Sequence, residues 1–332
     1  MKSLIKRAIL ESHLLQASQR WTASKLAILR YHSVRENPAE SAENIGCGIT
    51  HSAKVFLSQM RYVSSHCRVL GVDQVLEILR DHHPIPSRAV AITFDDGFSD
   101  NAVLAADILD RFKISGAFYL TVGSIDSGIA PWFVRLRFAF GKASVGSWLN
   151  PGDSVRFPVD TTEGRERAIN AACSTLACLA GDQQESALQD IENALGSPPV
   201  TEIPPLMMTW QQASMLRNAG HVIGSHSMTH PNLAHVPASA AEKELRDSKA
   251  RIEEKLGAPV VHFSYPSPFL SPHWNNLTRS LTDTIGYATA VTCDAGPVYS
   301  PGARLNLRRI YVPMDFDGFR WHLENTFCGR VL

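Results

Sequence analysis

Residues 89–100, AVAITFDDGFSD, are the stretch from which the rest of the chain can be interpreted. The first six residues are apolar and β-branched at the centre, which predicts a strand buried on both faces. Asp95, Asp96 and Gly97 follow directly. Because side chains alternate along an extended chain, the two acids point in different directions, so one can bind a metal ion while the other stays free as a base. Charged residues at the carboxyl end of a parallel strand lie where the active and binding sites of α/β proteins are usually found.

The same residues also fit a simple turn, since Asp and Gly are common in turns. The spacing beyond them predicts a helix over residues 100–113, with Ser99 or Asp100 as its N-cap. The apolar residues expected on one face of this helix are Val103, Leu104, Ile108, Leu109 and Phe112. A second group of potential metal ligands elsewhere in the chain, described below, makes the turn interpretation less favourable.

Predicted strands and helices alternate along most of the sequence. The strands are expected at residues 25–31, 89–94, 117–122, 221–225, 260–265, 287–292 and 309–312. The helices are expected at residues 55–66, 73–81, 100–113, 209–216, 239–256, 273–285 and 317–327. About seven strands that alternate with helices favour an α/β fold, a distorted (β/α)7-type barrel over residues 25–332.

Residues 123–205 interrupt this alternation. An aromatic-rich part begins at Pro131, and two helices are predicted at residues 163–180 and 183–195. We expect a helical insertion at about 123–205 that packs on the rim of the barrel and is not a separate domain. Residues 1–24 are expected to form an N-terminal helical segment.

Composition limits the classes of partner. The chain has 332 residues and no net formal charge, so nothing indicates the basic face of a nucleic-acid-binding protein. No stretch approaches membrane-spanning length. The N-terminus lacks the uninterrupted apolar region of a signal peptide, so we expect a cytoplasmic protein. A short apolar face there either docks onto the protein itself or makes peripheral membrane contact; it comprises Leu4, Ile5, Ile9 and Leu10.

The second group of potential metal ligands follows the strand predicted at residues 221–225. His226 and His230 are four residues apart, so on a helical turn or in a tight loop they face the same way. On its own this spacing is a weak indication of metal binding. Two histidines and one carboxylate are a ligand set of hydrolytic zinc and of non-haem iron. An additional free carboxylate favours hydrolysis, because it can take a proton from water.

The segments 93–97 (TFDDG) and 226–230 (HSMTH) together resemble the polysaccharide deacetylase family, also described as NodB-homology domains or carbohydrate esterase family 4. Residues 263–266 and 286–292 resemble later segments of that family, so the resemblance spans about 26–315 without the insertion. It implies a distorted βα-barrel, a divalent metal that is most often Zn²⁺, and removal of acetyl groups from sugar polymers. It also implies Asp95 as the general base, with the metal ligands Asp96, His226 and His230.

The third family segment, Arg-Pro-Pro-Tyr-Gly, reads Ser-Tyr-Pro-Ser-Pro over residues 264–268, a Tyr-Pro variant. The arginine that contacts the base in the family is therefore missing at Ser264. The family tyrosine whose backbone N–H helps to hold the oxyanion aligns with Ser267, which keeps an N–H group. Tyr265 and Ser267 are assigned to substrate or oxyanion contacts.

The late Leu-x-His segment of the family reads Leu-Arg-Arg over residues 307–309, so its usual general acid is absent. His32, at the end of the first predicted strand, is our candidate for the acid, because histidine titrates near neutrality. The alternative is that His32 hydrogen-bonds a loop backbone. Arg309 is the candidate for the positive charge that position 264 has lost.

The predicted function is metal-dependent N-deacetylation of an acetylated sugar polymer or its precursor. The alternatives are a non-catalytic sugar- or metal-binding protein on the same barrel and an amide hydrolase for small molecules. Trp132 and Trp274 are candidates for sugar contacts at the rim, and plain core packing explains each of them equally well.

Overall fold

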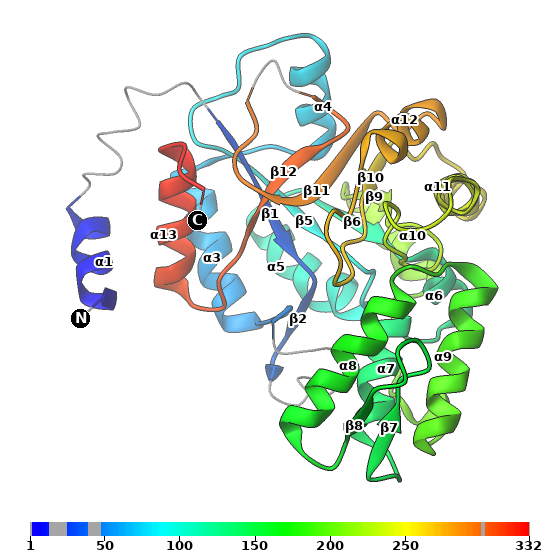
Figure 1. Ribbon diagram of the computed structural model, residues 1–332. Helices are drawn as coiled ribbons and strands as arrows, with labels where there is room; N and C mark the ends of the chain where they lie inside the picture. The colour runs from blue at the N-terminus through cyan, green and yellow to red at the C-terminus, as the bar shows by residue number, and fades with distance from the viewer. Residues whose placement is uncertain (1, 13–24, 39–47, 300–302, 332) are drawn as a thin grey trace.

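Seven parallel strands close into a barrel in the computed structural model, which describes residues 2–12, 25–38, 48–299 and 303–331 (Figure 1). Pairing of β1 with β5 closes the ring, from Leu26 opposite Ala89 to Tyr31 opposite Phe94. The prediction of a (β/α)7-type barrel is confirmed. Around the ring the strands are β1 (Leu26–Tyr31), β12 (Leu307–Tyr311), β11 (Thr289–Ala295), β10 (His262–Ser264), β9 (Val222–Ser225), β6 (Gly116–Leu120) and β5 (Ala89–Phe94).

Both faces of these strands are buried, which explains their nearly continuous apolar sequences. Alternate residues point into the barrel, where small side chains such as Ala89 and Ala91 pack with Ile28 and Tyr119. The residues between them point outward and contact the surrounding helices, as the fully buried Phe94 does. The short strand β4 (Arg68–Val69) pairs with the start of β5, and β2 (Ser33–Arg35) pairs separately with β3 (Thr50–Ser52).

The helices that follow the strands cover the outside of the barrel, except that the apolar residues of α4 pack with the barrel interior. Two predicted helix ends are confirmed. Thr209 caps α10 through a hydrogen bond to the Gln212 N–H, and Gly257 ends α11 with a φ of 63°. The helices are α3 (Ala53–His66), α4 (Val72–Arg80), α5 (Ala106–Arg111), α10 (Trp210–Asn218), α11 (Ala238–Leu256), α12 (Asn276–Thr284) and α13 (Phe316–Phe327).

The helix after the Asp-Asp-Gly segment differs from the prediction. Residues Asn101–Ala105 form a π-helical turn before α5, and the wider turn changes which side chains face the core. Val103, predicted to be buried, is 66% exposed. Asp100 does not cap the helix with its side chain. Its carboxylate instead accepts hydrogen bonds from the Ser33 hydroxyl and the Val34 N–H.

The segment between β6 and α10 packs around an apolar cluster of its own, with Trp132, Leu136 and Leu188 among its members (Figure 1, green). The two predicted helices are present as α8 (Thr162–Leu176) and α9 (Gly181–Leu195). The sequence analysis predicted neither the helix at residues 132–141 nor the antiparallel hairpin at residues 147–158. The remaining elements are α6 (Val122–Ser127), α7 (Trp132–Gly141), the antiparallel pair β7 (Ser147–Leu149) and β8 (Arg156–Pro158), and the 3₁₀ turn η3 (Val200–Glu202).

The N-terminal helix α1 (Lys2–Glu11) contacts α13, with the Lys6 ammonium 5.5 Å from the centre of the Trp321 ring (Figure 1). Residues 13–24 of the predicted N-terminal segment lie outside the described residues. Among the helices of the described residues, none combines the length and apolar character that crossing a bilayer requires.

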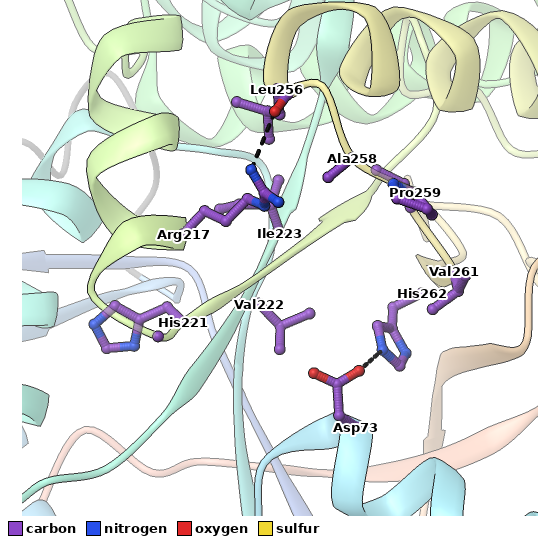
Figure 2. Close-up of a pocket in the computed structure, with 12 residues that line it drawn as sticks. Asp73, Arg217, His221, Val222, Ile223, Leu256, Ala258, Pro259, Val261 and His262 are labelled. Atoms are coloured by element: carbon purple, nitrogen blue, oxygen red, sulfur yellow. Dashed lines mark hydrogen bonds and ion pairs between the residues drawn. The ribbon is translucent and has the colours of Figure 1, made fainter.

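A cavity lies at each end of the barrel. The cavity at the amino-terminal ends of the strands has a volume of about 290 Å³ and contains Asp73, His221 and His262 (Figure 2). The cavity at the carboxyl ends has a volume of about 270 Å³ and contains Asp95, His226 and other candidate residues of the sequence analysis. The geometry of the second cavity determines what chemistry the protein can perform.

Candidate active site

Three potential metal ligands meet at the carboxyl end of the barrel. Asp96 follows β5, while His226 and His230 lie in the loop after β9, and all three side chains are buried. The Asp96 Oδ1 atom is 3.5 Å from His226 Nε2 and 3.4 Å from His230 Nε2. One donor atom from each residue lies within 4.8 Å of the others. The three predicted ligands are therefore close enough to bind one ion.

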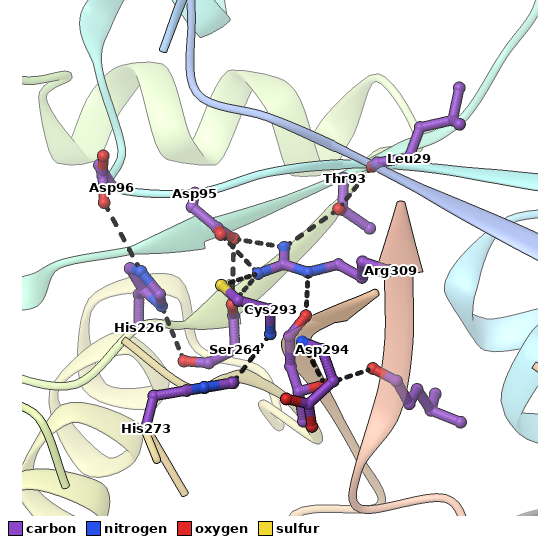
Figure 3. A network of polar contacts seen from close by, with 12 residues as sticks. Leu29, Thr93, Asp95, Asp96, His226, Ser264, His273, Cys293, Asp294 and Arg309 are labelled. Carbon is purple, nitrogen blue, oxygen red and sulfur yellow. Dashed lines mark hydrogen bonds and ion pairs between the residues drawn. The ribbon is translucent and has the colours of Figure 1, made fainter. Parts of the chain in front are cut away.

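The protonation states of His226 and Asp96 fit a divalent metal. The His226 Nδ1–H donates a hydrogen bond to the Ser264 carbonyl at 2.7 Å, which leaves the lone pair on Nε2 directed toward Asp96 (Figure 3). Burial lowers the pKa of His226 to about 4, so the ring is neutral at pH 7. Burial opposes ionisation of Asp96, but the hydrogen bond with His230 and the other nearby histidines together outweigh it, so the pKa of the carboxyl is lowered. Neutral imidazoles with a carboxylate are ligands for Zn²⁺ and similar ions.

The backbone of the site is held in an uncommon conformation. Asp96, Ser227 and His230 have φ values of 73°, 69° and 60°, in the left-handed region that non-glycine residues rarely occupy. Such strain costs about 1–3 kcal/mol per residue and persists only where the surroundings enforce it. A purely structural turn has no need of three such residues beside one cluster of ligands.

The loop that carries the two histidines is supported by Glu244 of α11. This buried carboxylate accepts hydrogen bonds from the Met228 N–H, the Thr229 N–H and the Thr229 hydroxyl. Phe133 of α7 contacts the loop from the other side, with its ring centre 4.9 Å from that of His230. The sequence analysis identified neither residue, because each contacts the loop only through tertiary packing.

Asp95 is separated from the ligand cluster and paired with Arg309 of β12. Arg309 Nη1 lies 2.8 Å from Asp95 Oδ1, and Arg309 Nη2 lies 2.6 Å from Oδ2 (Figure 3). The Ser264 hydroxyl also donates to Oδ1, and Arg309 Nε donates to the Thr292 carbonyl. Burial opposes ionisation of Asp95, but the charge and hydrogen bonds of Arg309, together with the nearby histidines, outweigh it and hold the pKa of the carboxyl well below its usual range. The carboxylate is therefore ionised at neutral pH.

His32 lies in the same cavity, after the end of β1. Burial lowers the pKa of this histidine to about 4, although the nearby Asp96 and Asp95 carboxylates act in the opposite direction. The ring is therefore neutral at pH 7. The backbone carbonyl of His32 accepts a hydrogen bond from the Asn101 side chain, and no described residue hydrogen-bonds the ring itself.

The remaining candidates fall into two groups. Ser267 lies on the wall of the cavity, and its N–H donates to no other residue in the described parts of the chain. Trp132 also borders the cavity, but it is 5% exposed and its indole N–H donates to the His230 carbonyl. Tyr265 lies elsewhere, fully buried, with its hydroxyl bonded to Thr282. Trp274 donates to Asp294 and is absent from the cavity wall.

Two further residues adjoin the Asp95–Arg309 pair. The Cys293 sulfur lies 3.7 Å from Arg309 Nη2, and the Cys293 N–H donates to His273 Nε2 at 2.9 Å (Figure 3). Burial lowers the pKa of His273 to about 4. The prediction of strand residues 287–292 ended one residue before Cys293, so the sequence analysis did not place this residue at the site.

Comparisons with known proteins agree with this geometry. Residues 82–290 match the family described as Polysaccharide deacetylase. No curated protein sequence matches the chain. Among solved structures, the chain is similar to the Streptococcus pyogenes deacetylase PplD in complex with acetate, with a TM-score of 0.61 at 17% identity over 92% of this chain and 99% of the other.

Two other solved structures are also similar. IcaB from Ammonifex degensii has a TM-score of 0.58 at 17% identity, with 91% of this chain and 98% of the other covered. BC0361, a polysaccharide deacetylase from Bacillus cereus, has a TM-score of 0.57 at 15% identity, with coverages of 91% and 69%. At these identities the structural likeness establishes the fold, and the sequence match establishes the family. The chain belongs to the polysaccharide deacetylase family.

Proposed function

We propose that the protein is a metal-dependent hydrolase that removes the acetyl group from the nitrogen of an acetylated sugar. The observation that carries this proposal is the position of the ionised Asp95 beside a separate Asp96–His226–His230 ligand cluster. A binding protein needs the ligands alone. A free carboxylate next to them supplies the base that hydrolysis requires.

Asp96, His226 and His230 would hold the ion, for which Zn²⁺ is our choice because two imidazoles and a carboxylate form a common zinc ligand set. When bound, such an ion supplies a Lewis acid that polarises a carbonyl and acidifies water. The rest of the chemistry is assigned to residues of this chain.

Asp95 is the proposed base. Its Oδ1 atom accepts hydrogen bonds from Arg309 and Ser264, whereas its Oδ2 atom accepts only from Arg309 among the described residues. A lone pair on Oδ2 is therefore available for the proton of the attacking water. Because Arg309 keeps the pKa of Asp95 low, the carboxylate holds that proton weakly and can pass it on.

Ser267 and His32 complete the proposed mechanism. The Ser267 N–H has no other acceptor among the described residues, so it can donate to the oxyanion of the tetrahedral intermediate. The neutral His32 ring is in the same cavity, and it can act only as a relay that accepts the proton taken from the water by Asp95 and passes it to the leaving amine. The bond between the carbonyl carbon and the nitrogen then breaks, which releases acetate and the free amine.

Acetate release tests the proposal. We expect the zinc-loaded protein to release acetate from N-acetylglucosamine oligomers and to lose this activity after chelation. Asp95→Asn should keep the metal and lower turnover by about 10²- to 10⁴-fold, because an amide does not accept the proton of water. Asp73→Asn, in the opposite cavity, is the matched control and should retain activity.

Three results would contradict this assignment. Near-normal turnover by Asp95→Asn would show that another group is the base. A zinc-loaded protein that binds acetylated oligomers without releasing acetate would be a binding protein. Release of acetate from acetanilide in preference to every acetylated sugar would instead identify an amide hydrolase for small molecules.

A further inference from the structure

We propose that Arg30 binds a negatively charged phosphate or carboxylate group on the sugar that is deacetylated. The inference rests on the proposed function, since it concerns the substrate of the same site. It extends that function from an acetylated sugar in general to an acetylated sugar that carries an anionic group beside the acetamide.

The direction of the Arg30 side chain follows from the alternation along β1. Leu26 and Ile28 point into the barrel and pack in its interior cluster, whereas Leu29 and Tyr31 point outward to the helices. Arg30, the second-to-last residue of β1, therefore points inward, close to the cavity at the carboxyl end of the strand. It lies on the cavity wall together with His32, two residues further on.

Among the described residues Arg30 lacks a partner, unlike Arg309 and Arg137 at the same end of the barrel. Arg309 is paired with Asp95, and Arg137 lies 3.4 Å from Glu166. In the described parts of the chain, no hydrogen bond or ion pair reaches the Arg30 guanidinium, although the residue is half-buried. Partial removal of a guanidinium from water costs free energy that a pairing group must offset. A ligand with an anionic group would supply that pairing.

The charge balance of the cavity favours the same conclusion. Asp95 and Asp96 are the carboxylates on its wall, and Arg309 neutralises the charge of Asp95. A bound divalent ion would more than offset Asp96. The loaded site would then carry a net positive charge from the ion and from Arg30, which favours an anionic substrate. The planar guanidinium donates two parallel hydrogen bonds to a phosphate or a carboxylate, so it suits both groups.

The test compares three substrates that share the acetamido sugar. They are N-acetylglucosamine 1-phosphate, N-acetylmuramic acid and the uncharged methyl N-acetylglucosaminide. We expect the zinc-loaded protein to prefer at least one charged sugar by about tenfold or more in kcat/KM, the effect of one charge-assisted hydrogen-bonded pair. Preference for the phosphate alone identifies a phosphorylated precursor, and preference for the carboxylate alone identifies an acidic sugar residue.

Arg30→Gln should remove this preference through a higher KM, while kcat/KM for the uncharged sugar stays within about threefold. Arg30→Lys should restore part of the preference, because it keeps the charge without the two parallel donors. Arg61→Gln is the control for net charge, since Arg61 is exposed on α3, outside the barrel. An equal loss on charged and uncharged sugars in Arg30→Gln, or no preference for either anion in the unchanged protein, would overturn the proposal.

A binding measurement separates this inference from the proposed function. Calorimetric titration of the Asp95→Asn protein with N-acetylglucosamine 1-phosphate and with N-acetylmuramic acid needs no turnover. Tenfold weaker binding after the additional Arg30→Gln substitution supports the role of Arg30 even if no acetate is ever released. Unchanged binding of both anionic sugars by the double variant overturns that role even if the enzyme is active.

Discussion

The two cavities of the barrel have similar volumes and contain the same kinds of residue, yet their polar groups are arranged differently. At the amino-terminal end, His262 contacts the Asp73 carboxylate at 2.8 Å (Figure 2). His262 also contacts the Thr289 hydroxyl at 2.7 Å. Arg217 there donates to the Leu256 carbonyl. Each of these side chains has its partner within the protein, and Asp73 and His262 have no positive φ.

At the carboxyl end, one carboxylate oxygen of Asp96 faces two histidines at 3.4–3.5 Å, and the backbone at Asp96 and His230 is in the left-handed region. The two cavities show that an aspartate and a histidine lining the same cavity are insufficient evidence of an active site. Donor atoms that converge on one point and a backbone held under strain distinguish the site from a structural pair.

The largest effect is expected from a substitution that removes one member of the Asp96–His226–His230 cluster. Asp96→Ala removes one of three protein ligands, so zinc affinity should fall by roughly a thousandfold or more, beyond the 10- to 100-fold cost of changing a residue that only supports a ligand. Zinc content after dialysis measures this loss. Asp73→Ala at the other end should keep its zinc, and full retention by Asp96→Ala would remove the site as described.

The next effect concerns the buried pair beside the cluster. Arg309→Met leaves the 1%-exposed Asp95 carboxylate without its cation, so the free energy of unfolding should fall by about 3–5 kcal/mol. The pKa of Asp95 should rise, because the positive charge that lowers it is gone, and the acidic limb of the pH–rate profile should move to higher pH. Urea unfolding and the pH profile measure the two changes.

Arg309→Lys serves as the comparison, since it keeps one charge but not the paired donors. It should lie between the original protein and Arg309→Met in both measurements. An acidic limb that stays in place in Arg309→Met would show that the profile reports a group other than Asp95.

A smaller effect follows from the buried histidines. The pKa values of His32, His226 and His273 are lowered to about 4, below the ordinary value of about 6.5 for an unfolded chain. Between these values the unfolded state binds more protons, so stability is fully present above pH 6.5 and is lost as the pH falls toward 4. Each histidine should lower the free energy of unfolding by about 2 kcal/mol as the pH falls from 6.5 to 5. Urea unfolding of the chelated protein measures this loss.

His32→Gln should reduce this pH dependence, because one titrating group is removed. A free energy of unfolding that is equal at pH 6.5 and pH 5 in the unchanged protein would mean that these rings are not neutral in the folded state.

The smallest effect is expected at the amino-terminal end. Asp73→Asn replaces one partner of His262, and the Asp73 side chain is 65% exposed. The free energy of unfolding should change by less than about 1 kcal/mol, as for other exposed pairs, with zinc content and acetate release unaltered. A loss of zinc in this variant would contradict the distinction between the two cavities.

Local sequence patterns were sufficient for the strands and most helices. The strand predicted at residues 89–94 is β5, and the caps at Thr209 and Gly257 are observed, because such features depend on residues adjacent in the chain. Local patterns placed two acids and two histidines at strand ends, and the resemblance to the polysaccharide deacetylase family selected Asp96, His226 and His230 among them as candidate metal ligands.

Local patterns misplaced three features. The Asp100 side chain bonds residues of β2 in place of the helix, Val103 faces solvent after the π-helical turn, and Tyr265 bonds Thr282 in the core. Asp100 and Tyr265 each have a partner supplied by the folded chain that local patterns do not reveal, whereas Val103 is turned to solvent by the wider π-helical turn.

The sequence by itself determined the alternation of strands and helices, and it placed two acids and two histidines at strand ends. The resemblance to the family had already suggested Arg309 as the positive charge beside Asp95, and the structure shows that contact across 214 positions of sequence. Only the tertiary structure decided its geometry, and only there does Arg30 border the cavity without a hydrogen bond or ion pair among the described residues. Hydrophobic periodicity and capping act between neighbours in the chain, whereas these pairings depend on how the closed barrel sets one strand against another.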